Sequence, residues 1–235
     1  MQYTIISIDE TRAANKADIR SKLTFDEVFP EFVNGKDREQ LLRARNKWNI
    51  PLPSGFSVGE YGIFYSLLNT LEFGQDNGIL YFEDDALVQP DFQQRFECYL
   101  ADFPDDLDFF VIWNASNQTY DYHNVKEYND KGEPIYHHRP LNSSAFDFGH
   151  SHLCKAYNGY GNVAMYFSPR GCKNTIEYIR RRGMFSTPDC LLYIGAHDGS
   201  LNAYSLKPDV PKLVEHDWNA QSTRAGTEWI ILSEI

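Results

Sequence analysis

Short apolar runs and longer amphipathic segments alternate along this chain, and their order predicts its fold class. The apolar runs of strand length are residues 3–8, 79–82, 109–113, 163–167 and 201–206, with a weaker one at 28–33. Segments that favour helices lie between them, at 13–23, 36–47, 57–74, 91–101 and 172–182. Strands that alternate with helices predict an α/β fold with a mainly parallel central sheet flanked by helices. Such sheets bind ligands at the carboxyl ends of their strands.

The clearest helix signal precedes the most unusual strand. Ser57 and Glu60 have the spacing of a capping box, in which two side chains satisfy free amide groups at the start of a helix. After this helix, the apolar run 79–82 is long enough to form a buried strand. The run stops abruptly at three carboxylates, Glu83-Asp84-Asp85, which are called the acidic triplet below.

Composition and charge narrow the class of protein. The 235 residues fit one domain, and 42% of them are hydrophobic, which is enough for a substantial core. A formal net charge of −11 disfavours a tight, charge-driven grip on nucleic acid or on an anionic membrane. No apolar run approaches the roughly 20 residues of a membrane helix, and the start lacks the basic and apolar regions of a signal peptide. We therefore expect a cytoplasmic protein without a membrane span.

The acidic triplet is the first candidate for chemistry. Because side chains alternate along a strand, we expect Glu83 and Asp85 on one side and Asp84 on the other. Two carboxylates on one side suit a hard divalent cation such as Mn²⁺ or Mg²⁺, which also binds diphosphate oxygens. Such a cation neutralises the charge that builds on a departing nucleoside diphosphate. A solvated acidic loop is the alternative, and the residues alone leave it open.

Several segments occur in the same order as the motifs of one known enzyme family. They are Ile5-Ile-Ser-Ile8 with Arg12, Phe32-Val-Asn-Gly35, Gly59-Glu-Tyr-Gly62 with Ser66, Gly78-Ile-Leu-Tyr-Phe-Glu-Asp-Asp-Ala86, Pro90-Asp-Phe92, Gly161-Asn-Val-Ala-Met-Tyr-Phe-Ser-Pro-Arg-Gly171 and Thr187-Pro-Asp189. On these motifs the chain resembles glycosyltransferase family 25, which includes lipooligosaccharide galactosyltransferases and is related to collagen galactosyltransferases. Two positions depart from the family pattern. Leu67 stands where a histidine usually follows the serine, and Ile63 stands where a cysteine is usual.

The resemblance implies a single GT-A type nucleotide-binding domain over residues 1–235, in which residues 114–158 form an acceptor-side loop or insertion. It also implies a nucleotide-sugar donor, for which we expect a UDP-sugar, a divalent cation, and inversion at the anomeric carbon. By position, Asp85 and Glu83 would hold the metal or the donor phosphates. The residues expected to flank the donor are Ser7, Arg12, Asn34, Glu60, Asp84 and Arg224. Helix capping is a sufficient alternative role for Glu60, and an ordinary loop arginine is the alternative for Arg12 and Arg224.

An inverting transfer needs a base that takes the proton from the attacking hydroxyl. Asp189 matches the late aspartate of the family, and Asp198, which is flanked by glycines, is its rival. A helix N-cap and a simple turn are the structural alternatives for these two residues. His216 is a candidate metal ligand, because GT-A enzymes often recruit a late histidine to the metal. A surface histidine is its alternative.

The acceptor is expected to be a hydroxyl group, and its carrier is left open. A saccharide is one class. A hydroxylated base in DNA, as in phage DNA modification, is another, with the basic cluster Arg180-Arg181-Arg182 and the aromatic loop 114–158 as its docking surface. The transferred sugar is a hexose or a pentose. Two competing functions stay open as well: a non-catalytic sugar- or nucleotide-binding protein that resembles a transferase, and a metal-dependent nucleotidyltransferase.

Overall fold

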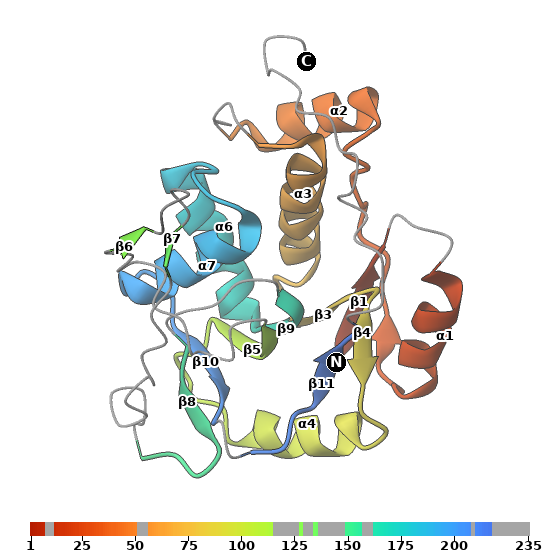
Figure 1. Cartoon of the computed structure of the whole chain (residues 1–235), viewed down its shortest axis with the longest axis vertical. Helices are drawn as coiled ribbons and strands as arrows, with labels where there is room; N and C mark the ends of the chain where they lie inside the picture. The colour runs from red at the N-terminus through yellow and green to blue at the C-terminus, as the bar shows by residue number, and fades with distance from the viewer. Residues whose placement is uncertain are drawn as a thin grey trace.

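Helices cover both faces of a central sheet in the computed structural model, which describes residues 1–7, 12–50, 56–114, 127–128, 134–135, 149–156, 162–207 and 210–217 (Figure 1). The helices are α1 (Ala13–Ser21), α2 (Arg38–Trp48), α3 (Val58–Phe73), α4 (Phe92–Ala101), α6 (Pro169–Arg182) and α7 (Pro188–His197). The strands of the central sheet are β1 (Gln2–Ile6), β2 (Asp26–Glu27), β3 (Ile79–Glu83), β5 (Phe109–Asn114), β8 (Leu153–Lys155), β9 (Asn162–Phe167) and β10 (Ala203–Leu206). None of the helices within these described ranges has the length and apolar character needed to cross a membrane.

The central sheet has seven strands in the order β2-β1-β3-β9-β5-β10-β8. Strand β1 pairs in parallel with β2 and β3, and β10 pairs in parallel with β5. Strand β9 lies between β3 and β5 and is antiparallel to both, while β8 is antiparallel to β10 at the sheet's margin. The expected α/β class is therefore confirmed. The sheet is mixed, because β9 and β8 run against the other five strands.

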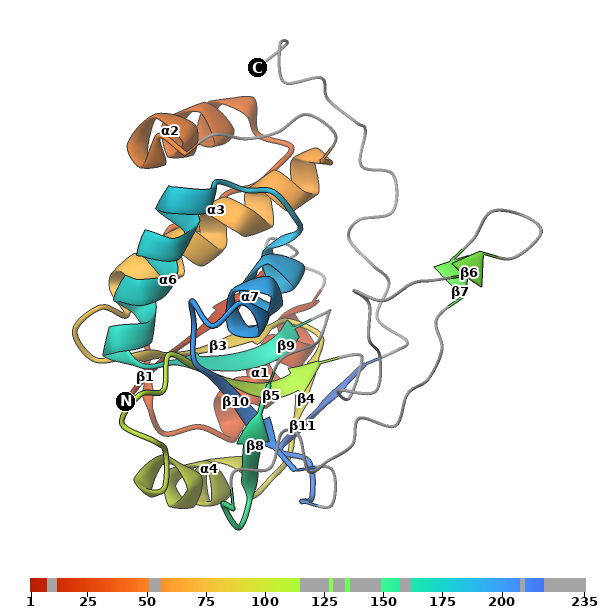
Figure 2. The same ribbon diagram turned by 90° about the vertical axis from the view of Figure 1, so that its left-hand side faces the viewer.

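Alternation along the central strands divides the core into two layers. On β3, Ile79 and Tyr81 face one side of the sheet, and Leu80 and Phe82 face the other. The first side packs against α2, α3, α6 and α7, and the second packs against α1 and α4 (Figure 2). Because β3 is buried on both faces, its sequence is a continuous apolar run.

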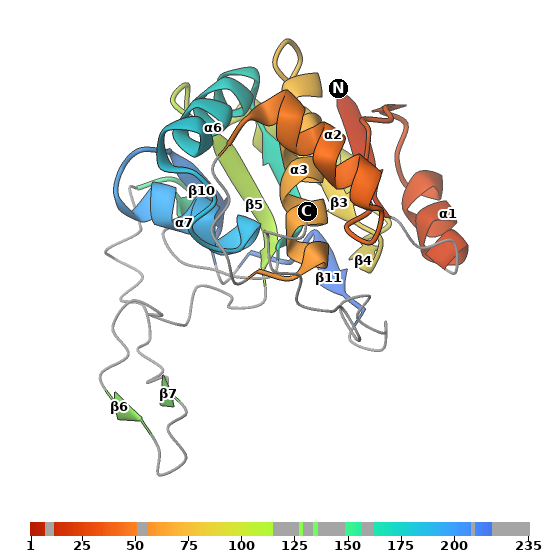
Figure 3. The same cartoon turned by 90° about the horizontal axis from the view of Figure 1, so that it is seen from above.

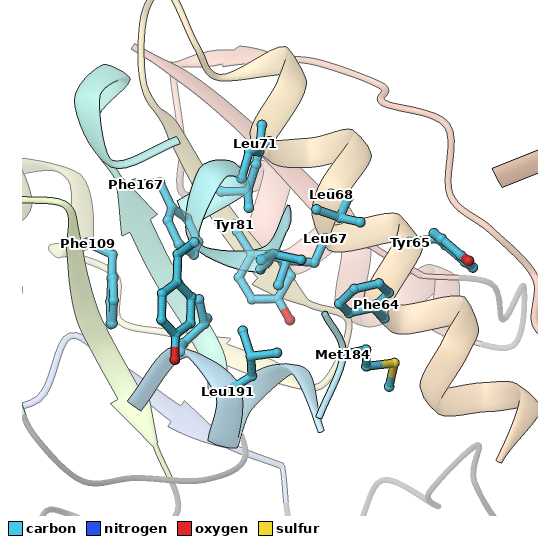
Figure 4. Close-up of a cluster of buried hydrophobic side chains, with 14 of the residues drawn as sticks. Phe64, Tyr65, Leu67, Leu68, Leu71, Tyr81, Phe109, Phe167, Met184 and Leu191 are labelled. Atoms are coloured by element: carbon cyan, nitrogen blue, oxygen red, sulfur yellow. The ribbon is translucent and has the colours of Figure 1, made fainter. Parts of the chain in front are cut away.

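Helix α3 is the centre of the first layer, and its start confirms the expected capping box. The Ser57 hydroxyl accepts a hydrogen bond from the Glu60 amide at 3.3 Å, and Glu60 Oε2 accepts one from the Ser57 amide at 2.6 Å. Further along the helix, Phe64 and Leu68 are fully buried and point toward the sheet residues shown in Figure 4. The expected end at Gly74 is confirmed too, since this residue is the C-cap.

Several expectations about secondary structure need correction. The weak strand expected at 28–33 is wrong, since β2 covers only Asp26–Glu27 and Pro30 has no amide hydrogen to continue a ladder. Helix α7 was not predicted, although Pro188 stands at a first helical position, where proline is favoured. The segment 114–158 was expected to be a loop, but β8 lies within it and extends the sheet. This segment also contains β6 (Glu127–Tyr128) and β7 (Pro134–Ile135), which pair with each other.

A separate two-stranded ribbon brings the end of the described chain next to β3. Strand β4 (Ala86–Val88) follows the acidic triplet and pairs with β11 (Val214–His216). The pairing is antiparallel, and His216 lies opposite Ala86. Neither strand was expected from the sequence.

Chain direction decides which candidate residues share an end of the sheet. Strands β1 and β3 end together, with Ile6 opposite Glu83, and we call this end the carboxyl edge. Because Phe167 at the end of β9 lies opposite Ile79, α6 starts at the other end of the sheet. The start of α7 lies near β3, since the charge of Asp189 acts on Tyr81. Figure 3 shows α1 beside β1 at one side of the molecule, and α6 and α7 at the other.

Candidate functional site

The acidic triplet lies at the carboxyl edge, beside the end of β1. Since Ile6 pairs with Glu83, Ser7 and Asp84 are the next residues on neighbouring strands. Ser7 hydrogen-bonds the Asp84 carboxylate. Burial raises the pKa of Asp84 above its ordinary value, while the Ser7 hydrogen bond and the Arg12 charge act in the opposite direction. The structure thus brings the expected donor-flanking residues Ser7, Arg12 and Asp84 together.

Arg12 joins two carboxylates of the triplet. Its Nη1 donates to Asp84 Oδ1 at 2.6 Å and lies 3.4 Å from Asp85 Oδ2. Only 10% of the Arg12 side chain is exposed, against 11% for Asp84 and 17% for Asp85. The alternation expected beyond Glu83 does not continue, because β3 ends at Glu83 and the next two residues form a turn. Asp84 and Asp85 therefore share one cation.

His216 reaches the triplet from the far end of the described chain. Its Nε2 lies 3.2 Å from Asp85 Oδ2, and the Asp217 amide donates to the Asp85 carbonyl at 2.9 Å. The ring of His216 stacks on that of Trp113, with centroids 5.3 Å apart. The β4–β11 ribbon supplies this geometry, since it holds His216 opposite Ala86 directly after the triplet.

Glu83 has a different partner from the other two carboxylates. Its Oε1 accepts a hydrogen bond from the Tyr81 hydroxyl at 2.8 Å. Burial raises the pKa of Tyr81 well above 10.0, and the nearby charges of Glu83, Asp85 and Asp189 add to this effect. Tyr81 is therefore a constant donor that fixes one oxygen of Glu83. The influence of Asp189 on Tyr81 means that Asp189 lies within electrostatic range of the hydroxyl that holds Glu83.

The two candidates for the base lie at opposite ends of α7. Asp189 is the second residue of this helix, is half-buried, and accepts from the Cys190 amide at 2.9 Å. Asp198 is the C-cap, is exposed, and accepts from the Ser200 amide at 2.9 Å in a turn. At a rise of about 1.5 Å per residue, nine residues of helix separate them by about 13 Å. The structure thus brings Asp189, and not Asp198, toward the triplet.

The motif around Glu60 forms a close packing contact between α3 and the loop before α2. A Cβ atom on Gly62 would lie 2.7 Å from the Val33 carbonyl oxygen and the Gly35 nitrogen. Ser66 Oγ accepts from the Val33 amide at 2.8 Å, which ties the same loop to the helix. Glu60 meanwhile caps α3. These contacts account for the motif structurally, and a role for Glu60 in donor binding stays a prediction.

Three positions singled out from the sequence remain to be placed: Asn34, Arg224 and Leu67. Asn34 follows Val33 in this loop, and its Oδ1 accepts from the Lys36 amide at 3.0 Å, which shapes the turn. Arg224 lies outside the described residues. Leu67 is buried in the core beneath α3, near Tyr81 (Figure 4). The position at which the family has a histidine therefore faces apolar surroundings here.

The residues present fit a divalent cation held by two protein side chains. Within the described ranges, no group of three or more His, Cys, Asp and Glu residues is arranged to hold a metal ion. Asp85 Oδ1, however, is buried and has no hydrogen-bond partner among these residues. Its carboxylate also lies against the His216 imidazole. Carboxylate, imidazole, phosphate oxygens and water form a donor set that suits Mn²⁺ or Mg²⁺, which commonly have one or two protein carboxylates.

Two residues of this site were missed from the sequence. Tyr81 holds Glu83, and Trp113 supports the His216 ring. Both lie in apolar runs, and such runs predict core packing rather than a role in a site. A signal existed in their positions, since each is an aromatic residue near the carboxyl end of a buried strand.

Comparison with known proteins adds no family assignment. No protein-family model matches the chain, and no curated protein matches its sequence. The resemblance to glycosyltransferase family 25 accordingly rests on the motifs quoted above.

Proposed function

We propose that this chain is a metal-dependent, inverting glycosyltransferase of the GT-A type, which moves a sugar from a nucleotide-sugar to a hydroxyl acceptor. The observation that carries the proposal is the convergence of Arg12, Asp85 and His216 at the carboxyl edge. These residues come from three distant parts of the sequence. A solvated acidic loop would not need a buried arginine or a histidine from the far end of the chain. The convergence therefore supports a ligand site.

In this proposal, Asp85 and His216 hold the cation, which supplies charge neutralisation for the leaving nucleoside diphosphate. Ser7, directly after β1, and Arg12, at the start of α1, flank the phosphates. Glu83, whose Oε1 accepts from Tyr81, stays a predicted residue of the metal and phosphate site. A UDP-sugar is the expected donor, on the family resemblance.

Asp189 is the proposed base. It takes the proton from the acceptor hydroxyl while the oxygen attacks the anomeric carbon and the bond to the diphosphate breaks. The proximity of Asp189 to Tyr81, whose hydroxyl holds Glu83, supports this role over Asp198, whose carboxylate belongs to a turn at the other end of α7.

The acceptor is proposed to be a saccharide or a hydroxylated base in DNA. The second class is supported by the end of α6, where Arg180, Arg181 and Arg182 are exposed. The Arg182 guanidinium lies over the exposed ring of Phe185, 5.2 Å from its centroid. This basic cluster immediately precedes the loop that leads to Asp189. Helix-terminal cations also complement the helix dipole, so the cluster has a structural role in either case.

A thermal-shift panel of nucleotide-sugars with and without Mn²⁺ tests the donor site. We expect one UDP-sugar to raise the melting temperature only when Mn²⁺ is present, because ligands that bind the folded state stabilise it. Absence of any metal-dependent shift across the panel would overturn the proposal. Transfer to a saccharide and to hydroxymethylated DNA, each with the Arg180–Arg182 cluster neutralised, then separates the acceptors. Only the DNA reaction should depend on the cluster.

One observation favours a competing function, a non-catalytic sugar- or nucleotide-binding protein. Arg12 already compensates Asp84 and Asp85, as expected for a site that has replaced its metal by an arginine. This alternative predicts that a nucleotide-sugar stabilises the chain equally with Mn²⁺ and with a chelator. The same panel therefore distinguishes the two functions.

A further inference from the structure

The N-cap position of α1 holds an arginine, which is unusual. Arg12 is the N-cap of this helix, it makes no side-chain capping bond, and no acidic residue stands in the first turn. A cation at a helix N-terminus is electrostatically unfavourable, because the macrodipole is positive there. The Arg12 side chain is nevertheless nine-tenths buried. Its position must therefore be stabilised by the two carboxylates that it contacts.

Those carboxylates in turn need a cation. Asp84 and Asp85 are mostly buried and adjacent, so without a positive charge they would repel each other in a poorly solvated place. The Arg12 guanidinium meets this need with a 2.6 Å contact to Asp84 and a 3.4 Å contact to Asp85. On Asp85 it approaches Oδ2, the same oxygen that His216 contacts, and so it lies beside the place where a metal would bind.

A divalent cation that enters this site meets the charge of Arg12 at close range. Like charges a few ångströms apart in a partly buried site oppose each other. This repulsion between Arg12 and the cation is relieved if Arg12 pairs with another anionic group. A nucleoside diphosphate provides one, since guanidinium groups pair well with phosphate oxygens.

We infer that Arg12 is a positioning residue that stands in for the divalent cation while the donor site is empty, and that it transfers to the donor diphosphate when metal and nucleotide bind together. This inference rests on the proposed function. Its consequence is coupling: Mn²⁺ binds weakly alone and tightly with UDP, and Arg12 adds to the coupling that the diphosphate oxygens supply as metal ligands. The chain therefore avoids holding a metal without its donor.

The test is the Mn²⁺ affinity, measured by the electron paramagnetic resonance signal of free Mn²⁺ with and without UDP. For the wild-type chain we expect UDP to tighten Mn²⁺ binding about tenfold or more, within the range usual for coupled sites. In Arg12→Gln, Mn²⁺ alone should bind about fivefold tighter than in the wild type, and the effect of UDP should fall by about the same factor. Arg20→Gln is the matched control. Arg20 is also on α1 and pairs with Glu27 at 2.7 Å, away from the triplet, so this variant should keep the wild-type coupling.

Each result is decisive. Unchanged Mn²⁺ affinity and unchanged coupling in a folded Arg12→Gln variant would overturn the inference while leaving the proposed function intact. If that variant does not fold, Arg12→Lys decides, because the lysine side chain ends one bond short of the position of Nη1, the nitrogen that contacts both carboxylates. It should bind Mn²⁺ alone more tightly than the wild type, and wild-type values would overturn the inference. Failure of the wild type to bind Mn²⁺ with UDP would overturn the proposed function and the inference together.

Discussion

Two aspartates at opposite ends of the sheet, one buried and one partly buried, differ in how fully their oxygens are hydrogen-bonded. Asp108 precedes β5 and is only 1% exposed. Its Oδ1 accepts from Asn174 Nδ2 at 2.8 Å, and its Oδ2 accepts from the Asn202 amide at 2.7 Å. Both oxygens thus have fixed neutral donors, and Arg170 Nε lies 3.5 Å from Oδ1. Asp85, at the carboxyl edge, has a buried Oδ1 with no hydrogen-bond partner in the described part of the chain.

This difference separates a structural carboxylate from one that is available to a ligand. Donors at Asp108 come from a helix and a loop that the carboxylate ties to the sheet, so its charge serves the fold. Asp85 is approached by Arg12 and His216, whose groups are those that contact phosphates and metals. Buried polar atoms are nearly always paired, so an open oxygen needs an explanation, and a bound cation supplies one.

The largest effect is expected when the ligand-facing aspartate is neutralised. Asp85→Asn should abolish the Mn²⁺-dependent stabilisation by a UDP-sugar and lower the transfer rate by about a thousandfold, the scale seen when an electrostatic stabiliser is lost. Thermal shift and a radiolabelled-sugar transfer assay measure the two quantities. Asp108→Asn is the control, and it should keep the metal-dependent shift. The comparison fails if both variants respond to Mn²⁺ and donor alike.

The next effect concerns the two ends of α7. Asp189→Asn should lower kcat by about a hundredfold or more, since a general base is lost, with donor binding unchanged. Asp198→Asn should leave kcat within about twofold, as expected for an exposed turn residue. Steady-state kinetics with a saturating donor measures both. A wild-type kcat for Asp189→Asn, or a large loss for Asp198→Asn, would reverse the assignment of the base.

On the structural side of the comparison, Asp108→Ala should destabilise the chain by about 2–3 kcal/mol, because the Asn174 amide and the Asn202 backbone amide lose their acceptor. Urea unfolding followed by circular dichroism gives this difference. Asp105→Ala is the matched control, since Asp105 lies three residues earlier in an exposed turn. Equal stability of the two variants would contradict the structural role of Asp108.

The sequence predicted the elements of the fold better than it predicted the partners of the acidic triplet. Continuous apolar runs identified β3 and β5, and the capping box identified the start of α3, because these signals are local. The acidic triplet stood out for the same reason. A single antiparallel strand such as β9 gives no local sign of its direction, so the mixed sheet could not be predicted from its apolar run.

The partners of the triplet depend on contacts between distant parts of the chain. His216 was a candidate only by analogy, and the β4–β11 ribbon that brings it to Asp85 consists of two three-residue strands without a clear pattern. Arg12 was expected near a nucleotide, and its ion pairs with Asp84 and Asp85 depend on the turn after β3. Local sequence does not specify such contacts, whose geometry is set by the fold.

A smaller structural effect is expected at the contact between α3 and the loop before α2. Alanine usually stabilises a helix relative to glycine, but a Cβ on Gly62 would lie 2.7 Å from backbone atoms of the loop. Gly62→Ala should therefore destabilise the chain by about 1–2 kcal/mol, as overpacking does. Gly195→Ala on α7 is the control, because its nearest neighbours are side-chain atoms of Leu201 and Tyr178, which have more freedom to move. Chemical denaturation of both variants tests the difference, and greater stability of Gly62→Ala than the wild type would contradict it.

The smallest effect is a pH dependence at the ligand-facing end. Burial raises the pKa of Asp84 above 3.8, so the folded state holds this proton more tightly than the unfolded state. The stability contributed by protonated Asp84 is fully present below pH 3.8 and is lost as pH rises through the raised pKa. Relative to the wild type, Asp84→Asn should therefore gain stability as pH rises through this window.

Arg12→Gln in the otherwise unchanged chain should move the window to higher pH, since the Arg12 charge lowers the pKa of Asp84. Unfolding free energies measured in urea from pH 3.5 to neutral, a range set by the ordinary aspartate pKa of about 3.9, test the direction. A stability difference between Asp84→Asn and the wild type that stays constant with pH would show that burial does not govern this carboxylate.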